Sequence, residues 1–176
     1  MKAIDMEQRR KLCGAVSRRG LLRGAAALAT AGAATLGAED DDKGHGAGGT
    51  ALAYFGCYTP NGKGIYLFSA NLGNGTLTPI NVFTGPGTTS PSWIALDPKH
   101  SYLYAVNETS PGTVSAFKID KTTGNLTFLN TVGSLGNGPA HMSIDPSGKF
   151  ALVANYGSGN IGVIRLNPDA QPQPQE

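Results

Sequence analysis

The sequence is poor in charged residues, in cysteine and in aromatic residues. Of its 176 residues, 15% are charged and 7% are aromatic, and there are two cysteines. The part that follows residue 38 has no basic patch and no basic helix, which excludes the usual nucleic-acid-binding surfaces. Residues 23–38 are weakly apolar, but the run is short and rich in alanine, so a membrane-spanning helix is a poor interpretation.

The few cysteines and histidines exclude several kinds of site. Cys13 lies in the basic N-terminal segment, and Cys57 is the single thiol that follows it, so we predict no intramolecular disulfide. His45, His100 and His141 are isolated, and no cluster has the spacing of metal ligands. A GxSxG nucleophile motif and a phosphate-binding loop are also missing from the sequence. We therefore predict neither a bound metal nor a cofactor.

The positive charge is concentrated at the N-terminus. Residues 1–38 carry seven basic and two acidic residues, whereas the rest of the chain has a net charge of −3. "SRRGLL" (Ser17–Leu22) precedes the alanine-rich run and resembles a twin-arginine export signal. The alternative is an ordinary amphipathic helix. We predict that residues 1–38 are a removable signal. The protein is then exported to the periplasm or beyond, without stable membrane insertion. Residues 39–51 are predicted to be a flexible acidic, glycine-rich spacer.

An internal repeat of about 48 residues is the strongest pattern in the chain. The chain holds 25 glycines and 11 prolines, which is typical of many turns between short strands. Four pairs of segments match at offsets of 47 to 49: 91–98 with 139–146, 102–107 with 150–155, 113–119 with 160–166, and 74–80 with 123–129. A repeat of this length indicates a repeated supersecondary unit.

Each repeat divides into four short strands. Apolar and polar residues alternate with period two over segments 91–97, 102–107, 113–119 and about 126–132, and again over 139–145, 150–155 and 160–166. Turn sequences such as "DPSGK" and "DKTTGN" separate them. Four antiparallel strands that recur every 40 to 50 residues are typical of a β-propeller blade. We predict an all-β fold in which strands 91–97 and 139–145 are adjacent innermost strands of neighbouring blades.

Consecutive motifs resemble one propeller family. "YFGCYT", "GIYLFSAN", "SPSWIALDP", "YLYAVNE", "GTVSAFKID" and "ALVANYGSGNIGVIRL" are similar to the seven-bladed propeller lactonases, which include the propeller-type 6-phosphogluconolactonases and the carboxymuconate lactonizing enzymes. The resemblance covers about residues 52–166. It implies a partial propeller of about two and a half blades and the hydrolysis of a small-molecule sugar lactone such as 6-phosphogluconolactone.

The repeats are too few to close a seven-bladed ring. Residues 52–166 provide about 2.4 units, and the proline- and glutamine-rich residues 167–176 are not expected to continue a sheet. We therefore expect a fragment or a truncated product, or completion by self-association through an open blade edge.

Strand direction predicts which residues meet at one mouth of the channel. In a blade the start of the first strand lies beside the end of the antiparallel second strand. This arrangement groups six residues at one mouth: Trp93, Asn107, Glu108, His141, Asn155 and Tyr156. Asp97 and Asp145 fall at the opposite rim, where we expect each carboxylate to cap its own turn. Trp93 is expected to pack between blades.

The resemblance gives these mouth residues a chemical interpretation. Lactone hydrolysis needs a base that activates water and donors that hold the oxyanion. His141 and Glu108 are the candidate catalytic residues, and Asn107, Asn155 and Tyr156 are candidates for binding substrate. The alternatives are a half-buried turn histidine, a solvated loop carboxylate and a non-catalytic periplasmic or surface propeller that binds a partner. Arg165, the single arginine after the N-terminal segment, is predicted to lie away from this mouth.

Overall fold

The computed structural model describes residues 33–36, 49–167 and 171–173, and every regular element in these ranges is a β-strand. The strands are β1 (Ala33–Leu36), β2 (Thr50–Gly56), β3 (Ile65–Asn71), β4 (Leu77–Phe83), β5 (Pro91–Leu96), β6 (Tyr102–Asn107), β7 (Thr113–Ile119), β8 (Leu126–Gly133), β9 (Pro139–Ile144), β10 (Phe150–Asn155) and β11 (Asn160–Arg165). From β5 onward, these strands agree with the predicted segments to within a residue or so at each end.

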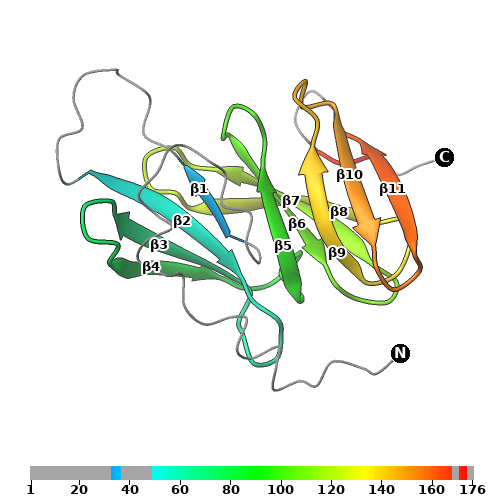
Figure 1. Ribbon diagram of the computed structural model, residues 1–176, viewed down its shortest axis with the longest axis horizontal. Coiled ribbons are helices and arrows are strands. Elements are labelled where there is room, and N and C mark those ends of the chain that lie inside the picture. The colour runs from blue at the N-terminus through cyan, green and yellow to red at the C-terminus, as the bar shows by residue number, and fades with distance from the viewer. Residues whose placement is uncertain (1–32, 37–48, 168–170, 174–176) are drawn as a thin grey trace.

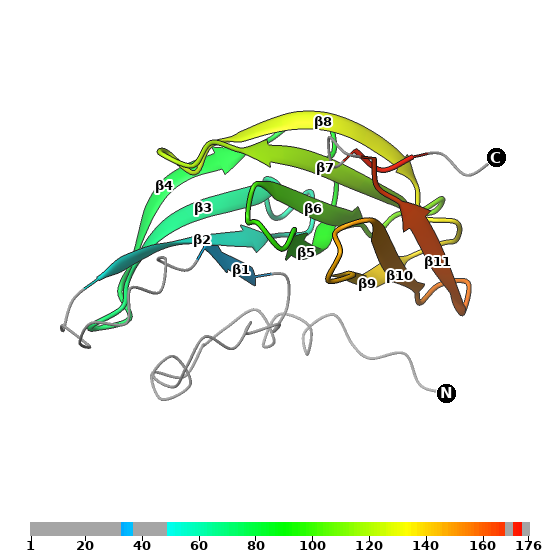
Figure 2. The ribbon, with the colours of Figure 1, turned by 90° about the horizontal axis from the view of Figure 1, so that it is seen from above.

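Three antiparallel sheets follow one another along the chain. Sheet 1 contains β1–β4, sheet 2 contains β5–β8 and sheet 3 contains β9–β11, each in sequence order (Figure 1). Figure 2 shows β1, β5 and β9 together on the inner side of the molecule and β8 on its outer side. This arrangement confirms the predicted all-β partial propeller.

The inner strands of sheets 2 and 3 lie side by side, as the repeat predicted. The Trp93 indole Nε1 on β5 donates a hydrogen bond of 2.8 Å to the Met142 carbonyl on β9. Ser92 Oγ donates to the Pro139 carbonyl at 3.3 Å. These two bonds run between sheets, so they fix the position of one blade relative to the next.

Strand β1 was not expected from the sequence. It lies at residues 33–36, inside the predicted export signal, and pairs antiparallel with β2 from Ala33↔Phe55 to Leu36↔Leu52. It occupies in sheet 1 the innermost position that β5 and β9 occupy in their sheets. Without it the inner edge of β2 would present unpaired backbone groups. The other residues of the predicted signal, and residues 39–48 of the predicted spacer, lie outside the described residues.

Sheet 3 has three strands, and residues 171–173 of the tail bond to the end of its last strand, where a fourth strand would begin. Leu166 and Pro172 form an isolated antiparallel bridge, and Gln173 N donates to the Arg165 carbonyl at 2.9 Å. Asn130 Nδ2 on β8 of the neighbouring sheet donates to the Pro172 carbonyl at 2.8 Å. The proline still accepts through its carbonyl although it has no N–H to donate. The tail therefore contributes one bridge where no pairing was expected.

Two apolar clusters fill the spaces between the sheets. Between sheets 2 and 3 the buried residues are Tyr104, Val106, Val114, Ala116, Met142, Ala151, Val153, Ile164 and Leu166. Between sheets 1 and 2 they are Tyr54, Ile65, Leu67, Ile94, Leu103, Ala105, Phe117 and Ile119. Because β6 sits between both clusters, Leu103–Val106 is buried on both of its faces.

The two DP turns have the structural role that the sequence predicted. Asp97 Oδ1 accepts hydrogen bonds from the backbone N of Ser101 and Tyr102, at 2.6 and 2.7 Å. Asp145 Oδ1 accepts from the backbone N of Lys149 and Phe150, at 2.8 and 2.7 Å. Hydrogen bonds, first from the Ser147 side chain and then from the backbone of Phe150, lower the pKa of Asp145. Both carboxylates are thus occupied by their own turns.

We expect the chain to lose stability at alkaline pH through Tyr54. This buried side chain donates from its hydroxyl to the Gly124 carbonyl at 2.7 Å, and burial followed by the charge of Asp120 raises its pKa from 10.0 to about 12. Because the pKa is raised in the folded state, the contribution of the Tyr54 hydroxyl to the free energy of unfolding is complete below pH 10. It is lost as the pH rises through about 12. Urea unfolding of the wild type and Tyr54→Phe should differ by about 1 kcal/mol at pH 8, in favour of the wild type. This difference in unfolding free energy should vanish or reverse by pH 12. A difference that stays constant with pH would contradict the prediction.

Candidate functional site

The strand register brings two sets of strand ends to one mouth of the molecule. Asn107 at the end of β6 pairs with Pro91 at the start of β5. Asn155 at the end of β10 pairs with Pro139 at the start of β9 in the same way. The loops at this mouth are also joined between sheets, because Gly138 N donates to the Thr109 carbonyl at 2.9 Å.

His141 is exposed at this mouth and lies against Trp93. The two ring centroids are 4.3 Å apart, with the planes tilted by 45°. The tryptophan is held in turn by its hydrogen bond to the Met142 carbonyl, and it packs on the cluster between sheets 2 and 3. The imidazole therefore rests on a fixed aromatic surface and keeps its access to solvent.

Glu108 is half-buried beside a tyrosine that the sequence analysis did not select. Tyr58, in the loop after β2, donates a hydrogen bond from its hydroxyl to Glu108 Oε2. Backbone N of Glu108 also donates to the Ser90 carbonyl at 3.0 Å. Tyr58 lies 50 residues before Glu108, which is close to the repeat length, so the repeat could have indicated this pair. The bond joins the loop after β6 in sheet 2 to the loop after β2 in sheet 1 and holds the carboxylate there.

The two candidate asparagines are buried and bonded within the fold. Asn155 is 1% exposed; its Nδ2 donates to the Ser134 carbonyl at 2.9 Å and its Oδ1 accepts from Ser134 Oγ at 2.7 Å. Asn107 is 3% exposed, and its Nδ2 donates to Ser115 Oγ at 2.6 Å and to Thr113 Oγ1 at 2.9 Å. This geometry favours a role in holding the loops over direct contact with a substrate, and their role as substrate donors stays a prediction.

Tyr156 is a strongly exposed candidate residue. It is 76% exposed in the loop after β10, and its backbone N donates to the Gly138 carbonyl at 2.9 Å. The side chain is therefore accessible to a ligand at the mouth, as a role in substrate binding requires.

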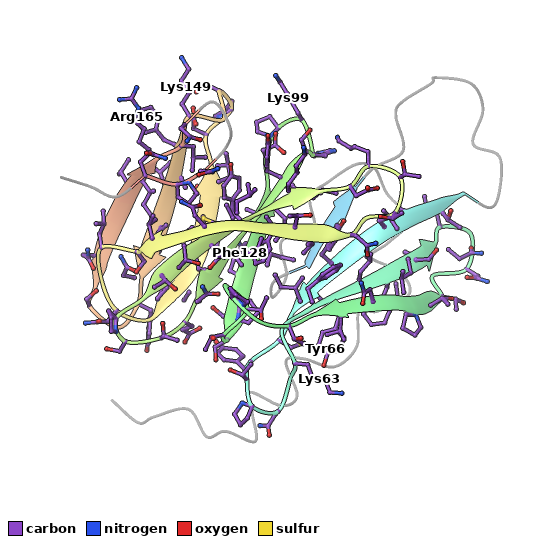
Figure 3. The ribbon with its side chains drawn as sticks, turned by 180° about the vertical axis from the view of Figure 1, so that it is seen from behind. Lys63, Tyr66, Lys99, Phe128, Lys149 and Arg165 are labelled. Atoms are coloured by element: carbon purple, nitrogen blue, oxygen red, sulfur yellow. The ribbon has the colours of Figure 1, made fainter. Side chains whose placement is uncertain are left out.

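Four of the described cations lie at two opposite ends of the molecule. Figure 3 shows Lys99, Lys149 and Arg165 at one end and Lys63 at the other. Lys63 lies in the loop between β2 and β3, the same loop that carries Tyr58. Arg165 is thus remote from the mouth, as the sequence predicted, whereas Lys63 is a cation at the mouth end that the sequence analysis did not weigh.

The structure gathers the predicted residues at one mouth but does not join them into one catalytic group. His141 contacts Trp93, and Glu108 binds Tyr58. Among the described hydrogen bonds, none joins His141 to Glu108. Within the described ranges there is also no group of three or more histidine, cysteine, aspartate or glutamate residues that could hold a metal ion. Nor do these ranges contain a helix of sufficient length and hydropathy to cross a membrane.

A comparison with models of protein families shows to which family the repeated sequence belongs. Residues 52–176 match the model of the family described as lactonase, 7-bladed β-propeller. The chain belongs to the seven-bladed β-propeller lactonase family. A 6-phosphogluconolactonase of Bacillus subtilis is 34% identical over 124 residues, which are 69% of this chain and 35% of the relative. A 6-phosphogluconolactonase of Formosa agariphila is 35% identical over 109 residues, which are 60% of this chain and 30% of the relative.

A solved structure supports the same assignment. The periplasmic gluconolactonase of Pseudomonas aeruginosa is similar with a TM-score of 0.64 and 25% identity, over 70% of this chain and 36% of that protein. This lactonase propeller chain therefore spans about a third of the length of the relatives that it matches.

Proposed function

We propose that this chain is part of an exported lactonase that opens a sugar lactone, such as 6-phosphogluconolactone, by the attack of water on the ester carbonyl. The observation that carries the proposal is the family match over residues 52–176, together with relatives whose names are 6-phosphogluconolactonase. The exposed imidazole of His141 at the mouth supports it, because a base must reach both water and substrate.

In this proposal His141 accepts the proton of the attacking water. Trp93 limits the rotation of the imidazole, and the apolar face of the indole gives the sugar ring a surface against which to pack. Tyr58 and Glu108 form a second polar pair on the neighbouring loops, where they can bind substrate hydroxyls. Lys63 is a cation at this end that can attract an anionic substrate.

A chimera tests the proposed reaction. We expect the 176-residue chain alone to hydrolyse gluconolactone and 6-phosphogluconolactone no faster than buffer, because the match to this chain covers 35% of the Bacillus subtilis relative. Residues 52–166 placed in the matching segment of the Bacillus subtilis relative should give a chimera that hydrolyses 6-phosphogluconolactone. The measurement is the rate of acid release, with circular dichroism as a control for folding. A folded but inactive chimera would instead favour the non-catalytic binding module.

We propose export through the twin-arginine route. The arginine pair before an alanine-rich run supports it, and the similar Pseudomonas aeruginosa protein is a periplasmic gluconolactonase. Changing Arg18 and Arg19 to lysine should abolish the export of a reporter fused after residue 38. The matched control changes Arg9 and Arg10, a second arginine pair in the same segment, and should leave export intact. Export that persists in the first variant would contradict the twin-arginine route.

A further inference from the structure

Ser90, the residue before β5, has a backbone conformation that favours glycine. Its φ is 46°, in the left-handed region that residues with a side chain rarely adopt. The equivalent residue one repeat later is Gly138, which precedes β9 and has a φ of 56°. The first of these two positions therefore carries a side chain although its backbone would be less strained without one.

Ser90 and Gly138 have the same backbone role. The Ser90 carbonyl accepts a hydrogen bond from Glu108 N at 3.0 Å, and the Gly138 carbonyl accepts one from Tyr156 N at 2.9 Å. Glu108 and Tyr156 directly follow β6 and β10, so the two bonds are equivalent in sheets 2 and 3. Because a glycine makes this bond in sheet 3, the bond alone does not account for the serine side chain in sheet 2.

The serine hydroxyl makes a contact between sheets 1 and 2. Ser90 Oγ lies 3.1 Å from Thr59 Oγ1 in the loop after β2, and either hydroxyl can donate. A comparable contact between sheets 2 and 3 is made by the backbone, because Gly138 N donates to the Thr109 carbonyl at 2.9 Å. Among the described backbone hydrogen bonds, none joins Thr59 to Ser90. At this boundary the two hydroxyls thus provide the contact that the backbone provides at the next one.

This contact lies next to the pair formed by Tyr58 and Glu108. Tyr58 precedes Thr59 in the chain, and its hydroxyl donates to Glu108 Oε2. Ser90 and Glu108 are bonded to each other, and each also bonds to the loop after β2. Thr59 and Ser90 are half-buried, whereas Tyr58 is 48% exposed. The bond between the two hydroxyls is therefore partly shielded from water, while Tyr58 is accessible to a ligand.

We propose that Ser90 is a positioning residue, whose hydroxyl holds the loop after β2 so that Tyr58 and Glu108 are already together when they bind substrate hydroxyls. This inference rests on the lactonase function proposed above. Without the Ser90 hydroxyl, part of the binding free energy is spent on ordering the pair, which weakens binding. Strained backbone conformations cluster at functional sites, where the surrounding contacts hold them. A glycine at position 90 would relieve the strain but lose the contact with Thr59.

Three variants of Ser90 in the chimera with the Bacillus subtilis relative separate the hydroxyl from the backbone. Ser90→Ala and Ser90→Gly both remove the hydroxyl, and each should raise KM for 6-phosphogluconolactone about three- to tenfold with kcat nearly unchanged. Ser90→Thr keeps a hydroxyl and should keep KM within about twofold of the parent chimera. Stability should follow the backbone instead. The urea midpoint should be higher for Ser90→Gly than for Ser90→Ala, and Ser90→Thr should be less stable than the parent, because a branched side chain suits a positive φ poorly.

Two further variants are matched controls. Thr59→Val replaces the second hydroxyl of the contact by a methyl group, so KM should rise as it does in Ser90→Ala. The double variant should show no further increase, since both changes break the same contact. His100→Gly relieves the same kind of strain in the turn after β5, where φ is 52°, and should raise the urea midpoint without a change in KM.

Hydrogen exchange in the full 176-residue chain tests the positioning step without any activity. Gly62 N donates to the Tyr58 carbonyl at 2.6 Å within the loop after β2, and its exchange should be about threefold or more faster in Ser90→Ala and Ser90→Gly, but not in Ser90→Thr. Gly159 N, which donates to the Asn155 carbonyl at 2.8 Å in the loop after β10, should exchange at the same rate in all variants.

Two results would overturn the role of Ser90. One is a KM that follows stability, with Ser90→Gly like the parent chimera and Ser90→Thr impaired, because Ser90 would then act through the fold alone. The other is unchanged exchange of Gly62 N in the variants without the hydroxyl. A folded but inactive parent chimera would instead contradict the proposed lactonase function and the binding of substrate hydroxyls, and the exchange of Gly62 N would still decide whether the hydroxyl holds the loop.

Discussion

Replacement of His141 by alanine should lower kcat about 100-fold in the active chimera with the Bacillus subtilis relative. A positioned general base contributes about 10² to 10⁴ to the rate of a reaction of this kind. His141 is the described histidine at the mouth, and its ring lies on Trp93 at 4.3 Å. The rate of 6-phosphogluconolactone hydrolysis measures the effect, and the loss should be in kcat more than in KM because the base acts in the chemical step.

His100 provides the matched control for this experiment. It is exposed and lies in the DP turn after β5, at the rim opposite His141. His100→Ala should leave the rate within about twofold of the parent chimera, because surface changes away from a site have small effects. Equal rates for the two variants would exclude His141 as the base and would direct attention to Glu108 and its partner Tyr58.

Replacement of Leu103 by alanine should cost about 2–5 kcal/mol of unfolding free energy. Leu103 is 0% exposed and packs in the cluster between sheets 1 and 2. Truncation of a buried leucine removes the transfer free energy of the deleted atoms and leaves a cavity between sheets that cannot fully collapse. Urea unfolding followed by far-UV circular dichroism measures the change through the shift in the transition midpoint.

Leu77→Ala is the control for side-chain size. Leu77 begins β4 and is 44% exposed, so the same deletion should cost about 0.5 kcal/mol or less. A similar loss in both variants would mean that the space between sheets 1 and 2 is loosely packed in solution. No loss in either would mean that the two sheets do not dock.

The strands were predictable because each carries its own signal. Segments such as 102–107 and 150–155 are short, nearly continuous apolar runs between turn sequences, which suits strands with a neighbouring sheet on each face, and the 48-residue repeat then fixes the order of the sheets. Strand β1 was not predictable for the opposite reason. Residues 33–36 lie in an alanine-rich run without alternation, and their pairing depends on the open edge of β2 rather than on their own sequence.

The site was predictable in position but not in detail. Strand direction alone placed His141, Glu108 and the two asparagines at one mouth. The burial of Asn107 and Asn155 depends on serines 8 and 21 residues away, Ser115 and Ser134. No local pattern predicts such contacts, because they arise when loops of adjacent strands pack together.

The bond from the Trp93 indole to the Met142 carbonyl makes the chain its own optical reporter. Trp93 is the single tryptophan in the sequence, and its indole is bonded across the boundary between sheets 2 and 3. Its fluorescence should therefore shift to longer wavelength when sheet 3 separates from sheet 2, even while sheet 1 stays intact. The emission of the folded protein consequently reports on the boundary between sheets 2 and 3, with no label and no substrate.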